Sequence, residues 1–182
     1  MRPRPHRAVV LILVAAALVA CGRDPRPGPP SEPPVETGLT VIPPDQRQSA
    51  PTIAGQTLTG GFLDVAEMRG EPVLVNAWAT WCSPCRAEIP ILVAAARTHR
   101  EVRFVGLDVQ DRTAAAQVFA EEMQMTYPSI VDDSGQTLAG IPGVPPRALP
   151  STITIDREGR IAARAIGPVT DQMVRRMIAA AR

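Results

Sequence analysis

The sequence predicts a mixed α/β domain in which a central sheet is flanked by helices. Apolar runs of strand length alternate with segments of helical periodicity, in the order strand, helix, strand, helix, strand, strand and helix. Helices between the early strands favour parallel pairing, and the last two strands are close enough along the chain for an antiparallel hairpin. A chain of 182 residues has room for one such domain and some additional length.

The first half of the domain follows from turn residues and apolar periodicity. A turn dipeptide between two short segments predicts a small hairpin over 57–63, and a short turn follows it. The uninterrupted apolar run at 72–79 predicts a strand that is buried on both faces. Apolar side chains at helical spacing predict a helix over 83–100, which Pro90 is expected to kink.

The second half contains the remaining strands and helices. The mostly apolar segment 101–109 predicts a strand in the centre of the sheet, and Asp111 or Thr113 is expected to cap the helix after it. Thr170 or Asp171 is expected to cap a helix that runs to the C-terminus. The other predicted segments are a helix at 114–125, a short strand at 128–132, a proline-rich loop at 141–149, and two hairpin strands at 150–156 and 160–165.

Composition and charge exclude several function classes. The formal net charge at pH 7 is +1, so the chain has no excess of basic charge for a nucleic-acid partner. It contains no lysine, which excludes chemistry through a lysine Schiff base. The cysteines have separate contexts: Cys21 ends an N-terminal apolar run, and Cys82 and Cys85 form a closely spaced pair.

The N-terminus has the pattern of an export signal. Basic residues precede an apolar run that is too short to span a bilayer, and residues 1–20 have the length of a signal peptide. The segment LVAC, which ends at Cys21, resembles the bacterial lipobox, and this resemblance implies cleavage before Cys21 and lipid attachment to it. Ordinary secretion with an incidental Cys21 is the alternative. Under either interpretation the domain works outside the cytoplasm, and lipidation would place it on the extracytoplasmic face of the bacterial cell membrane.

A proline-rich stretch connects this N-terminus to the domain. Residues 21–50 lack the apolar periodicity that a core requires, and they are expected to be disordered or polyproline-like. They are interpreted as a semi-rigid tether that begins at the lipidated Cys21 and holds the domain, residues 51–182, off the membrane. Recognition by a proline-binding partner is the alternative.

The segment WCSPC at 81–85 carries the chemistry. Its two thiols are separated by two residues at a strand-to-helix turn, where they can form a small-ring disulfide. Backbone N–H groups at the start of a helix stabilise a thiolate, so Cys82 is predicted to be the nucleophile and Cys85 the more buried resolving thiol. A static disulfide is the alternative, although so short a loop makes a poor cross-link. A metal site would need ligands beyond the two thiolates, and His99 is the only histidine after Cys21.

The segment 69–90, RGEPVLVNAWATWCSPCRAEIP, resembles the active-site block of the TlpA/ResA/DsbE group, whose members are membrane-tethered and have a thioredoxin fold. The segment LPST at 149–152 adds to the resemblance, which extends more loosely from residue 51 to the last helix. It implies an α/β thioredoxin fold, a central mixed sheet flanked by helices, with an N-terminal β-hairpin extension and an inserted helix. Ala77, where the group usually carries Phe, and the proline-rich loop depart from the pattern, and both bear on the substrate surface more than on the chemistry.

The resemblance assigns site-shaping roles next to the cysteines. It implies that Trp81 covers one side of the dithiol and that Pro84, which follows Ser83, stiffens the turn between the cysteines. Packing in the core is the alternative for Trp81. Asn76 lies within the predicted buried strand and is a further candidate for a buried polar residue near the site.

Two more residues receive catalytic roles from the resemblance. Glu88 lies three residues after Cys85, where a carboxyl group would tune the protonation of the dithiol or relay a proton to Cys85. An ordinary glutamate that complements the helix dipole is the alternative. Pro150 corresponds to a cis-proline that faces the dithiol, and the neighbouring backbone of Leu149 and Ser151 would pair with an incoming peptide.

The resulting prediction is an extracytoplasmic, lipid-anchored thiol-disulfide oxidoreductase with no cofactor and no metal ion. By resemblance it would reduce disulfides in apocytochrome c or other exported proteins and receive electrons from a CcdA/DsbD-like membrane protein. Oxidation of exported thiols by the same site is the main alternative, because the direction depends on the reduction potential. A peroxidase is disfavoured, since the peroxidase branch carries Thr three residues before its reactive cysteine, where this chain has Ala79. A tethered metallochaperone or binding module is the alternative without enzymatic activity.

Overall fold

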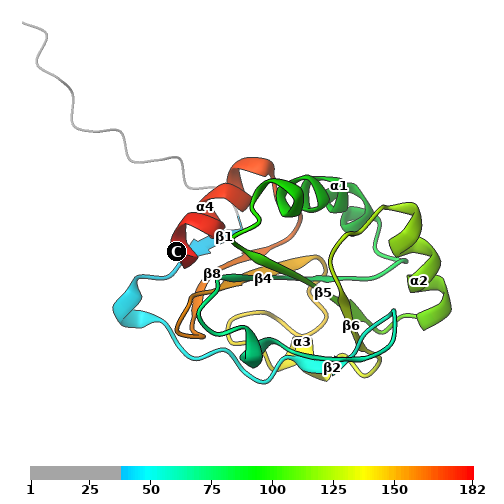
Figure 1. The fold of residues 1–182 in the computed structure, drawn as a ribbon, viewed down its shortest axis with the longest axis horizontal. Helices are drawn as coiled ribbons and strands as arrows, with labels where there is room; N and C mark the ends of the chain where they lie inside the picture. Colours follow the sequence, from blue (N-terminus) through cyan, green and yellow to red (C-terminus); the bar gives the residue numbers. More distant parts are fainter. Residues whose placement is uncertain (1–37) are drawn as a thin grey trace, which may run out of the picture. The chain divides into compact units, whose positions relative to one another are not determined.

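A computed structural model of the protein describes residues 38–182 (Figure 1). They contain a six-stranded sheet in the order β1-β8-β7-β4-β5-β6 and a separate two-stranded sheet of β2 and β3. The strands are β1 (Leu39–Val41), β2 (Ala54–Gln56), β3 (Phe62–Asp64), β4 (Val73–Trp78), β5 (Arg103–Val109), β6 (Ser129–Asp132), β7 (Ser151–Ile155) and β8 (Ile161–Ile166). The helices are α1 (Ser83–Thr98), α2 (Thr113–Glu122), α3 (Gln136–Ala139) and α4 (Asp171–Ala181), with 3-10 helices η1 (Pro44–Gln46) and η2 (Val65–Met68).

β4 lies inside the large sheet and leads into α1. It pairs in parallel with β5 and antiparallel with β7, and β5 pairs in parallel with β6. β8 pairs antiparallel with both β7 and β1. The prediction of parallel strands first and an antiparallel hairpin last is confirmed, and so is the central mixed sheet flanked by helices. Every residue of β4 is buried, as the apolar run predicts.

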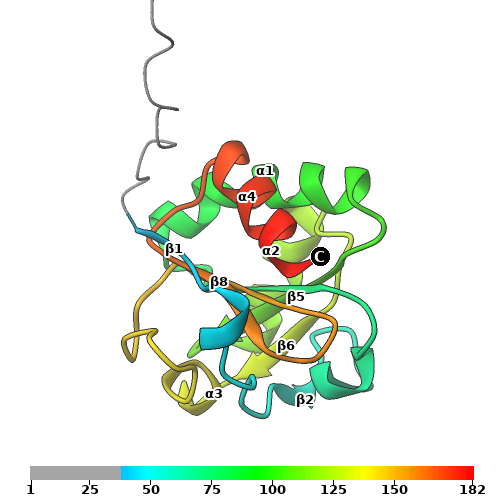
Figure 2. The same cartoon turned by 90° about the vertical axis from the view of Figure 1, so that its left-hand side faces the viewer.

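Helices cover both faces of the large sheet (Figure 2). α1, α2 and α4 share one apolar cluster, to which Leu92, Phe119 and Met177 belong. α3 and η2 lie on the opposite face, where Leu138 and Val65 join a second cluster. None of the helices within residues 38–182 combines the length and apolarity that are needed to cross a membrane.

The N-terminal hairpin exists, but the prediction of its first strand at 57–58 is wrong. β2 pairs with β3, and residues 57–61 form the connection between them. Thr57 bridges Ile130 of β6, and the backbone N–H of Leu58 donates to the carbonyl oxygen of Ser129 at 2.9 Å. Leu58 leaves the hairpin because its side chain is buried in the cluster that α1 and α2 share.

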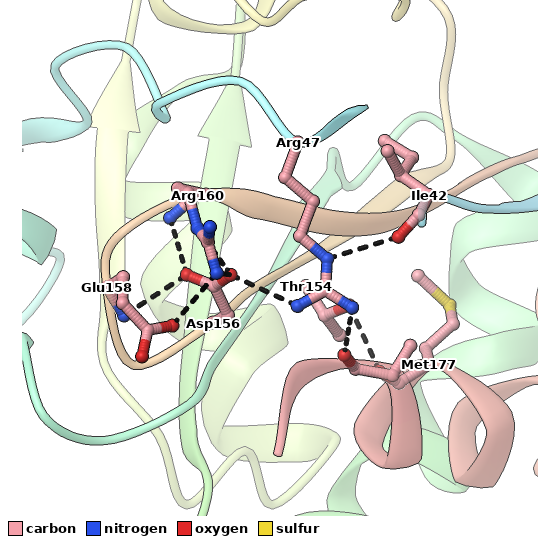
Figure 3. A network of polar contacts seen from close by, with 8 residues as sticks. Ile42, Arg47, Thr154, Asp156, Glu158, Arg160 and Met177 are labelled. Carbon is pink, nitrogen blue, oxygen red and sulfur yellow. Dashed lines mark hydrogen bonds and ion pairs between the residues drawn. The ribbon is translucent and has the colours of Figure 1, made fainter. Parts of the chain in front are cut away.

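The folded domain begins before the predicted boundary at residue 51. β1 pairs with β8, and the side chain of Arg47 is largely buried. Its guanidinium donates to the carbonyl oxygen of Ile42 at 3.1 Å and to the carboxylate of Asp156 at 3.1 Å (Figure 3). It also donates to the carbonyl oxygen of Ala180 at 2.8 Å. The expectation of a disordered tether is therefore wrong from residue 38 onward. This segment has no apolar face, and it is held in place by the pairing of β1 with β8 and by the hydrogen bonds of the Arg47 guanidinium. The signal peptide, Cys21 and the rest of the predicted tether lie outside the described residues.

Helix capping follows the prediction at one of two places. Thr170 caps α4, since its hydroxyl oxygen accepts a hydrogen bond from the N–H of Met173 at 3.2 Å. α2 begins at Thr113 without a side-chain cap, so the expected cap at Asp111 or Thr113 is wrong. The carboxylate of Asp111 is engaged by Thr80 instead. The short helix α3 has no counterpart among the predicted segments, and the proline-rich loop at 141–149 follows it.

Candidate active site

Cys82 and Cys85 form a disulfide where β4 runs into α1. Cys82 is the N-cap of the helix and Cys85 lies in its first turn, with their Cα atoms 5.3 Å apart. The backbone N–H of Cys85 points at the Cys82 sulfur at 3.2 Å. Ser83 and Pro84 occupy the first helical positions, where a missing N–H costs no helical hydrogen bond. The predicted pair thus meets at a helix N-terminus, where free N–H groups and the helix dipole favour a thiolate in the reduced state.

Exposure distinguishes the two sulfur-bearing residues. Cys82 retains 5% of its surface, whereas Cys85 is completely buried. Arg86, which follows Cys85, is exposed and lies over the ring of Phe119 at 4.6 Å from the centroid. Its charge is therefore engaged by an aromatic face. An incoming substrate can reach Cys82 before Cys85.

The two tryptophans near the site have different surroundings. Trp81 is 60% exposed, and its indole Nε1 donates to the carbonyl oxygen of Gln110 at 3.1 Å. Trp78 is fully buried, packs against the ring of Phe119 and donates to Ser129 Oγ at 3.3 Å. The alternative of core packing is therefore wrong for Trp81, which is free to form part of the surface around the dithiol, whereas Trp78 packs in the core.

Pro150 lies at the same end of the sheet as the dithiol. The Leu149–Pro150 peptide bond is cis, as expected. β7 begins with Ser151, which pairs with Ala77 near the end of β4, so the start of β7 lies beside the strand that leads to Cys82. Ser151 Oγ donates to the carbonyl oxygen of Ala148 at 2.7 Å, which fixes the chain at this point.

Glu88 is buried in the second turn of α1, with 1% of its surface exposed. Its Oε1 accepts a hydrogen bond from Asn76 Nδ2 at 2.7 Å, and its Oε2 accepts one from the N–H of Val169 at 2.8 Å. Burial raises the pKa of Glu88 to about 7, although both hydrogen bonds act to lower it. A solvated glutamate that only complements the helix dipole does not fit these surroundings. The carboxyl group changes charge near neutral pH.

Asn76 connects the strands to this carboxyl group. Besides Glu88, its Nδ2 donates to Thr152 Oγ1 at 3.0 Å, so one amide joins β7, β4 and α1. Asn76 is completely buried, as its place in an apolar run suggested, and its Oδ1 has no hydrogen-bond partner among the described residues. The partner across the sheet could not be inferred from the sequence, because Thr152 is far away along the chain.

Sequence reasoning missed the contacts made by Gln110 and Asp111. The carboxylate of Asp111 accepts hydrogen bonds from both the N–H and the hydroxyl of Thr80, two residues before Cys82. The carbonyl oxygen of Gln110 accepts from the indole of Trp81. An aspartate just before a helix usually indicates a cap, so the sequence signal for Asp111 pointed to the wrong partner.

Asp108 is a second buried acid, on β5. It is 1% exposed, and neither carboxylate oxygen has a hydrogen-bond partner among the described residues. Burial raises its pKa to about 7, and the charges of Asp111 and Asp133 act in the same direction. The only available sequence signal was a charged residue within the mostly apolar run at 104–109.

The metal-site alternative needs ligands in addition to the two cysteines. Within residues 38–182, no group of three or more His, Cys, Asp or Glu side chains is placed to hold a metal ion. His99 follows the last turn of α1, at the opposite end of the helix from Cys82, and its Nδ1 lies 3.3 Å from Glu101 Oε1.

Comparisons with known proteins agree with this geometry. The family model described as AhpC/TSA family matches residues 47–164. The thiol-disulfide oxidoreductase ResA of Bacillus thuringiensis (strain Al Hakam) is 29% identical over 129 residues, which cover 70% of this chain and 73% of that protein. The structure of a DsbF homologue from Corynebacterium diphtheriae has a TM-score of 0.74 and 31% identity, covering 81% of this chain and 96% of that chain. A secreted thiol-disulfide isomerase from Corynebacterium glutamicum has a TM-score of 0.71 and 28% identity, covering 81% and 93% respectively.

The family match includes β4, the segment that contains both cysteines, and α1. The similarities match the arrangement that the residues themselves build, a disulfide at the N-terminus of the helix that follows a central strand. The chain therefore belongs to the AhpC/TSA family, and it is a thiol-disulfide oxidoreductase with a thioredoxin fold of the TlpA/ResA/DsbE type.

Proposed function

We propose that this oxidoreductase works outside the cytoplasm, anchored to the membrane through a lipid on Cys21, and reduces disulfides of exported proteins such as apocytochrome c. The observation that carries the proposal is the asymmetric pair, with Cys82 reachable at a helix N-terminus and Cys85 buried behind it. Similarity to a secreted thiol-disulfide isomerase supports the location. The lipobox-like segment that ends at Cys21 supports the anchor.

The reaction begins with the reduced pair. The Cys82 thiolate attacks one sulfur of a substrate disulfide, the substrate S–S bond breaks, and one substrate sulfur leaves as a thiolate that takes up a proton. Cys85 then loses its proton and attacks the Cys82 sulfur, which releases the second substrate thiolate and closes the Cys82–Cys85 disulfide. Two electrons have passed to the substrate. A dithiol of a CcdA/DsbD-like membrane protein returns them by the same exchange.

Glu88 accepts the proton that Cys85 loses. It lies three residues after Cys85 and is buried on the same helix, with a pKa of about 7. A base of that pKa is half in its acceptor form near neutral pH, where proton transfer is most effective.

The start of β7 is the surface on which a substrate peptide docks. Leu149 precedes Pro150 at the end of the sheet that leads to Cys82, and its backbone is the proposed pairing edge. Ser151, which already pairs with β4 on one side and β8 on the other, shapes the site next to it. The exposed ring of Trp81 supplies apolar surface on the other side of the dithiol.

Reduction of insulin disulfides by the purified chain tests the proposal. Wild type is expected to turn over with an added dithiol, and Cys82→Ala is expected to abolish turnover. A rate that Cys82→Ala leaves unchanged would remove Cys82 as the nucleophile. Peroxide consumption and metal analysis of the same preparation examine the peroxidase and metallochaperone alternatives.

Equilibration with glutathione decides the direction of electron flow. A reduction potential near that of thioredoxin, about −270 mV, supports the reductase. A value near that of strong protein oxidants, about −120 mV, would reverse the direction and make the protein a thiol oxidase.

A further inference from the structure

A tight turn leads from β4 to Cys82. The backbone N–H of Cys82 donates to the carbonyl oxygen of Ala79 at 3.2 Å, so Thr80 and Trp81 are the two central residues of a turn between β4 and α1. The position of Cys82 relative to the helix N-terminus therefore depends on how these two residues are held.

Both central residues are held by the segment that follows β5. The carboxylate of Asp111 accepts the backbone N–H of Thr80 and also its hydroxyl, the latter at 2.8 Å. The carbonyl oxygen of Gln110 accepts the indole N–H of Trp81 at 3.1 Å. Consecutive residues of one segment thus contact consecutive residues of the turn.

Among residues 38–182, Asp111 makes no other long-range polar contact. Its remaining hydrogen bond comes from the N–H of the next residue, Arg112, at 2.8 Å. Within residues 38–182 it takes part in no ion pair, and it does not cap α2. The contacts that its carboxylate makes outside its own segment all go to Thr80.

Gln110 is hydrogen-bonded to the end of β6 and to the turn that follows it. It adopts a φ of 50°, a left-handed conformation that is uncommon for residues other than glycine. The backbone N–H of Gln110 donates to the carbonyl oxygen of Asp132 at 3.1 Å. Its side-chain amide donates to the carbonyl oxygen of Ser134 at 3.3 Å. A Cβ atom at Gly135 would lie 3.2 Å from the Gln110 side chain, so the glycine leaves the room that this side chain uses. An unfavourable backbone conformation persists here because several surrounding contacts define it.

We propose that Gln110 and Asp111 form a clamp that positions Thr80 and Trp81 and thereby sets the reactivity of Cys82. The proposal rests on the proposed function in that Cys82 is the attacking residue. Asp111 is a positioning residue, because it acts through Thr80. The clamp also orients Trp81, so it determines where the exposed ring stands beside an approaching substrate.

Two substitutions at Asp111 separate position from charge. In Asp111→Ala the turn loses its acceptor, and the second-order rate of Cys82 alkylation by iodoacetamide in the reduced full-length chain is expected to fall about tenfold. Asp111→Asn keeps one of the two oxygen acceptors and removes the negative charge, and its rate is expected to lie between those of Asp111→Ala and wild type, whereas a charge effect would make both variants react at least as fast as wild type. The matched control is Asp133→Ala, an exposed acid nearby that makes no hydrogen bond to the turn within residues 38–182, and it is expected to leave the rate unchanged.

A double-mutant cycle identifies the contact. Thr80→Val removes the hydroxyl and keeps the backbone N–H, so its effect on alkylation is expected to be smaller than that of Asp111→Ala and largely absent when Asp111 is already alanine. If Asp111→Ala does not fold, Thr80→Val takes its place in the comparison with wild type. Additive effects of the two substitutions would contradict a shared contact.

The outcomes distinguish the clamp from the proposed function. If folded Asp111→Ala and wild type are alkylated at equal rates, the clamp proposal is wrong, whatever the rate of insulin reduction. A lower melting temperature of the variant, without a change in the alkylation rate, does not support the clamp. A wild type that fails to reduce insulin, with the alkylation differences intact, overturns the proposed function and leaves the clamp standing.

Discussion

Asn76 Nδ2 lies 2.7 Å from Glu88 Oε1, so the centre of β4 is hydrogen-bonded to the helix that carries Cys85. The N–H of Val169, just before α4, holds the other oxygen of the same carboxyl group. A buried acid is thereby fixed from two elements while burial keeps its pKa at about 7. The protonation state near the resolving thiol depends on this balance between desolvation and hydrogen bonding.

Asn76→Ala is expected to raise the pKa of Glu88 further above about 7, because burial remains while one stabilising hydrogen bond is lost. Carbon-13 NMR titration of the glutamate carboxyl groups measures it. Thr152→Val is the matched control, since it removes the other acceptor of Asn76 and leaves the bond to Glu88. Equal shifts in both variants would contradict the assigned role of Asn76.

Glu88→Gln is expected to flatten the pH dependence of stability. The pKa is raised in the folded state from 4.5 to about 7, so the folded protein binds this proton more tightly than the unfolded chain. The contribution is complete below the unfolded pKa and is lost as the pH rises through the folded one. In urea denaturation, the fall in the free energy of unfolding between about pH 5 and pH 8 should shrink by about 2 kcal/mol in the variant. An unchanged fall would place the titration elsewhere.

Asp108→Asn is expected to stabilise the protein above neutral pH. The folded pKa of Asp108 is raised from 3.8 to about 7, so its ionised form is disfavoured in the core and stability is lost as the pH rises through that value. The variant should gain about 2 kcal/mol in the free energy of unfolding at about pH 8 and little at about pH 4. Asp133→Asn, at an exposed position, serves as the control, and an equal gain there would point to general charge repulsion.

Cys85→Ser is expected to trap a mixed disulfide between Cys82 and substrate, because no thiol remains to resolve it. Non-reducing electrophoresis after mixing with a peptide disulfide should show the adduct, and a reductant should release it. Cys82→Ser should give none, since Cys85 is buried. An adduct of equal yield in Cys82→Ser would reverse the assignment of the two thiols.

Arg47→Ala is expected to lower the free energy of unfolding by about 2 kcal/mol, because three acceptors lose a shared, largely buried donor. Arg47→Lys keeps the charge without the fork of donors and should recover part of the loss. Arg175→Ala breaks an exposed pair with Asp171 and should change stability by less than about 0.5 kcal/mol. Chemical denaturation compares the three, and similar losses at Arg47 and Arg175 would show that burial is irrelevant here.

Local patterns explain what could be predicted from the sequence. The cysteine pair, the buried strand before it and the cap at Thr170 depend on neighbours within a few residues, and the structure agrees with them. The contacts that the sequence did not reveal are long-range. Arg47 and Asp156 are 109 residues apart, and no periodicity links them.

Asp111 shows how a local rule fails when the fold offers a better partner. Its position before a helix favours capping of that helix. Because β5 ends beside β4, the carboxylate instead accepts hydrogen bonds from the N–H and the hydroxyl of Thr80. Asp108 is the opposite case, a charged residue in an apolar strand whose burial depends on packing from several elements. Neither outcome is encoded within a short window of sequence.

The pairing of β1 with β8 determines how the domain would respond to mechanical tension from its N-terminal side. Force transmitted along the chain reaches β1 first, and only three residue pairs join it to β8. Beyond β1, the N–H of Ile42 donates to the carbonyl oxygen of Ala162 at 2.8 Å. The guanidinium of Arg47 follows, hydrogen-bonded to the β7–β8 turn and to the end of α4. Strain would therefore be absorbed at this edge before it reached β4, and the geometry of the dithiol would survive a pull that frees the first strand.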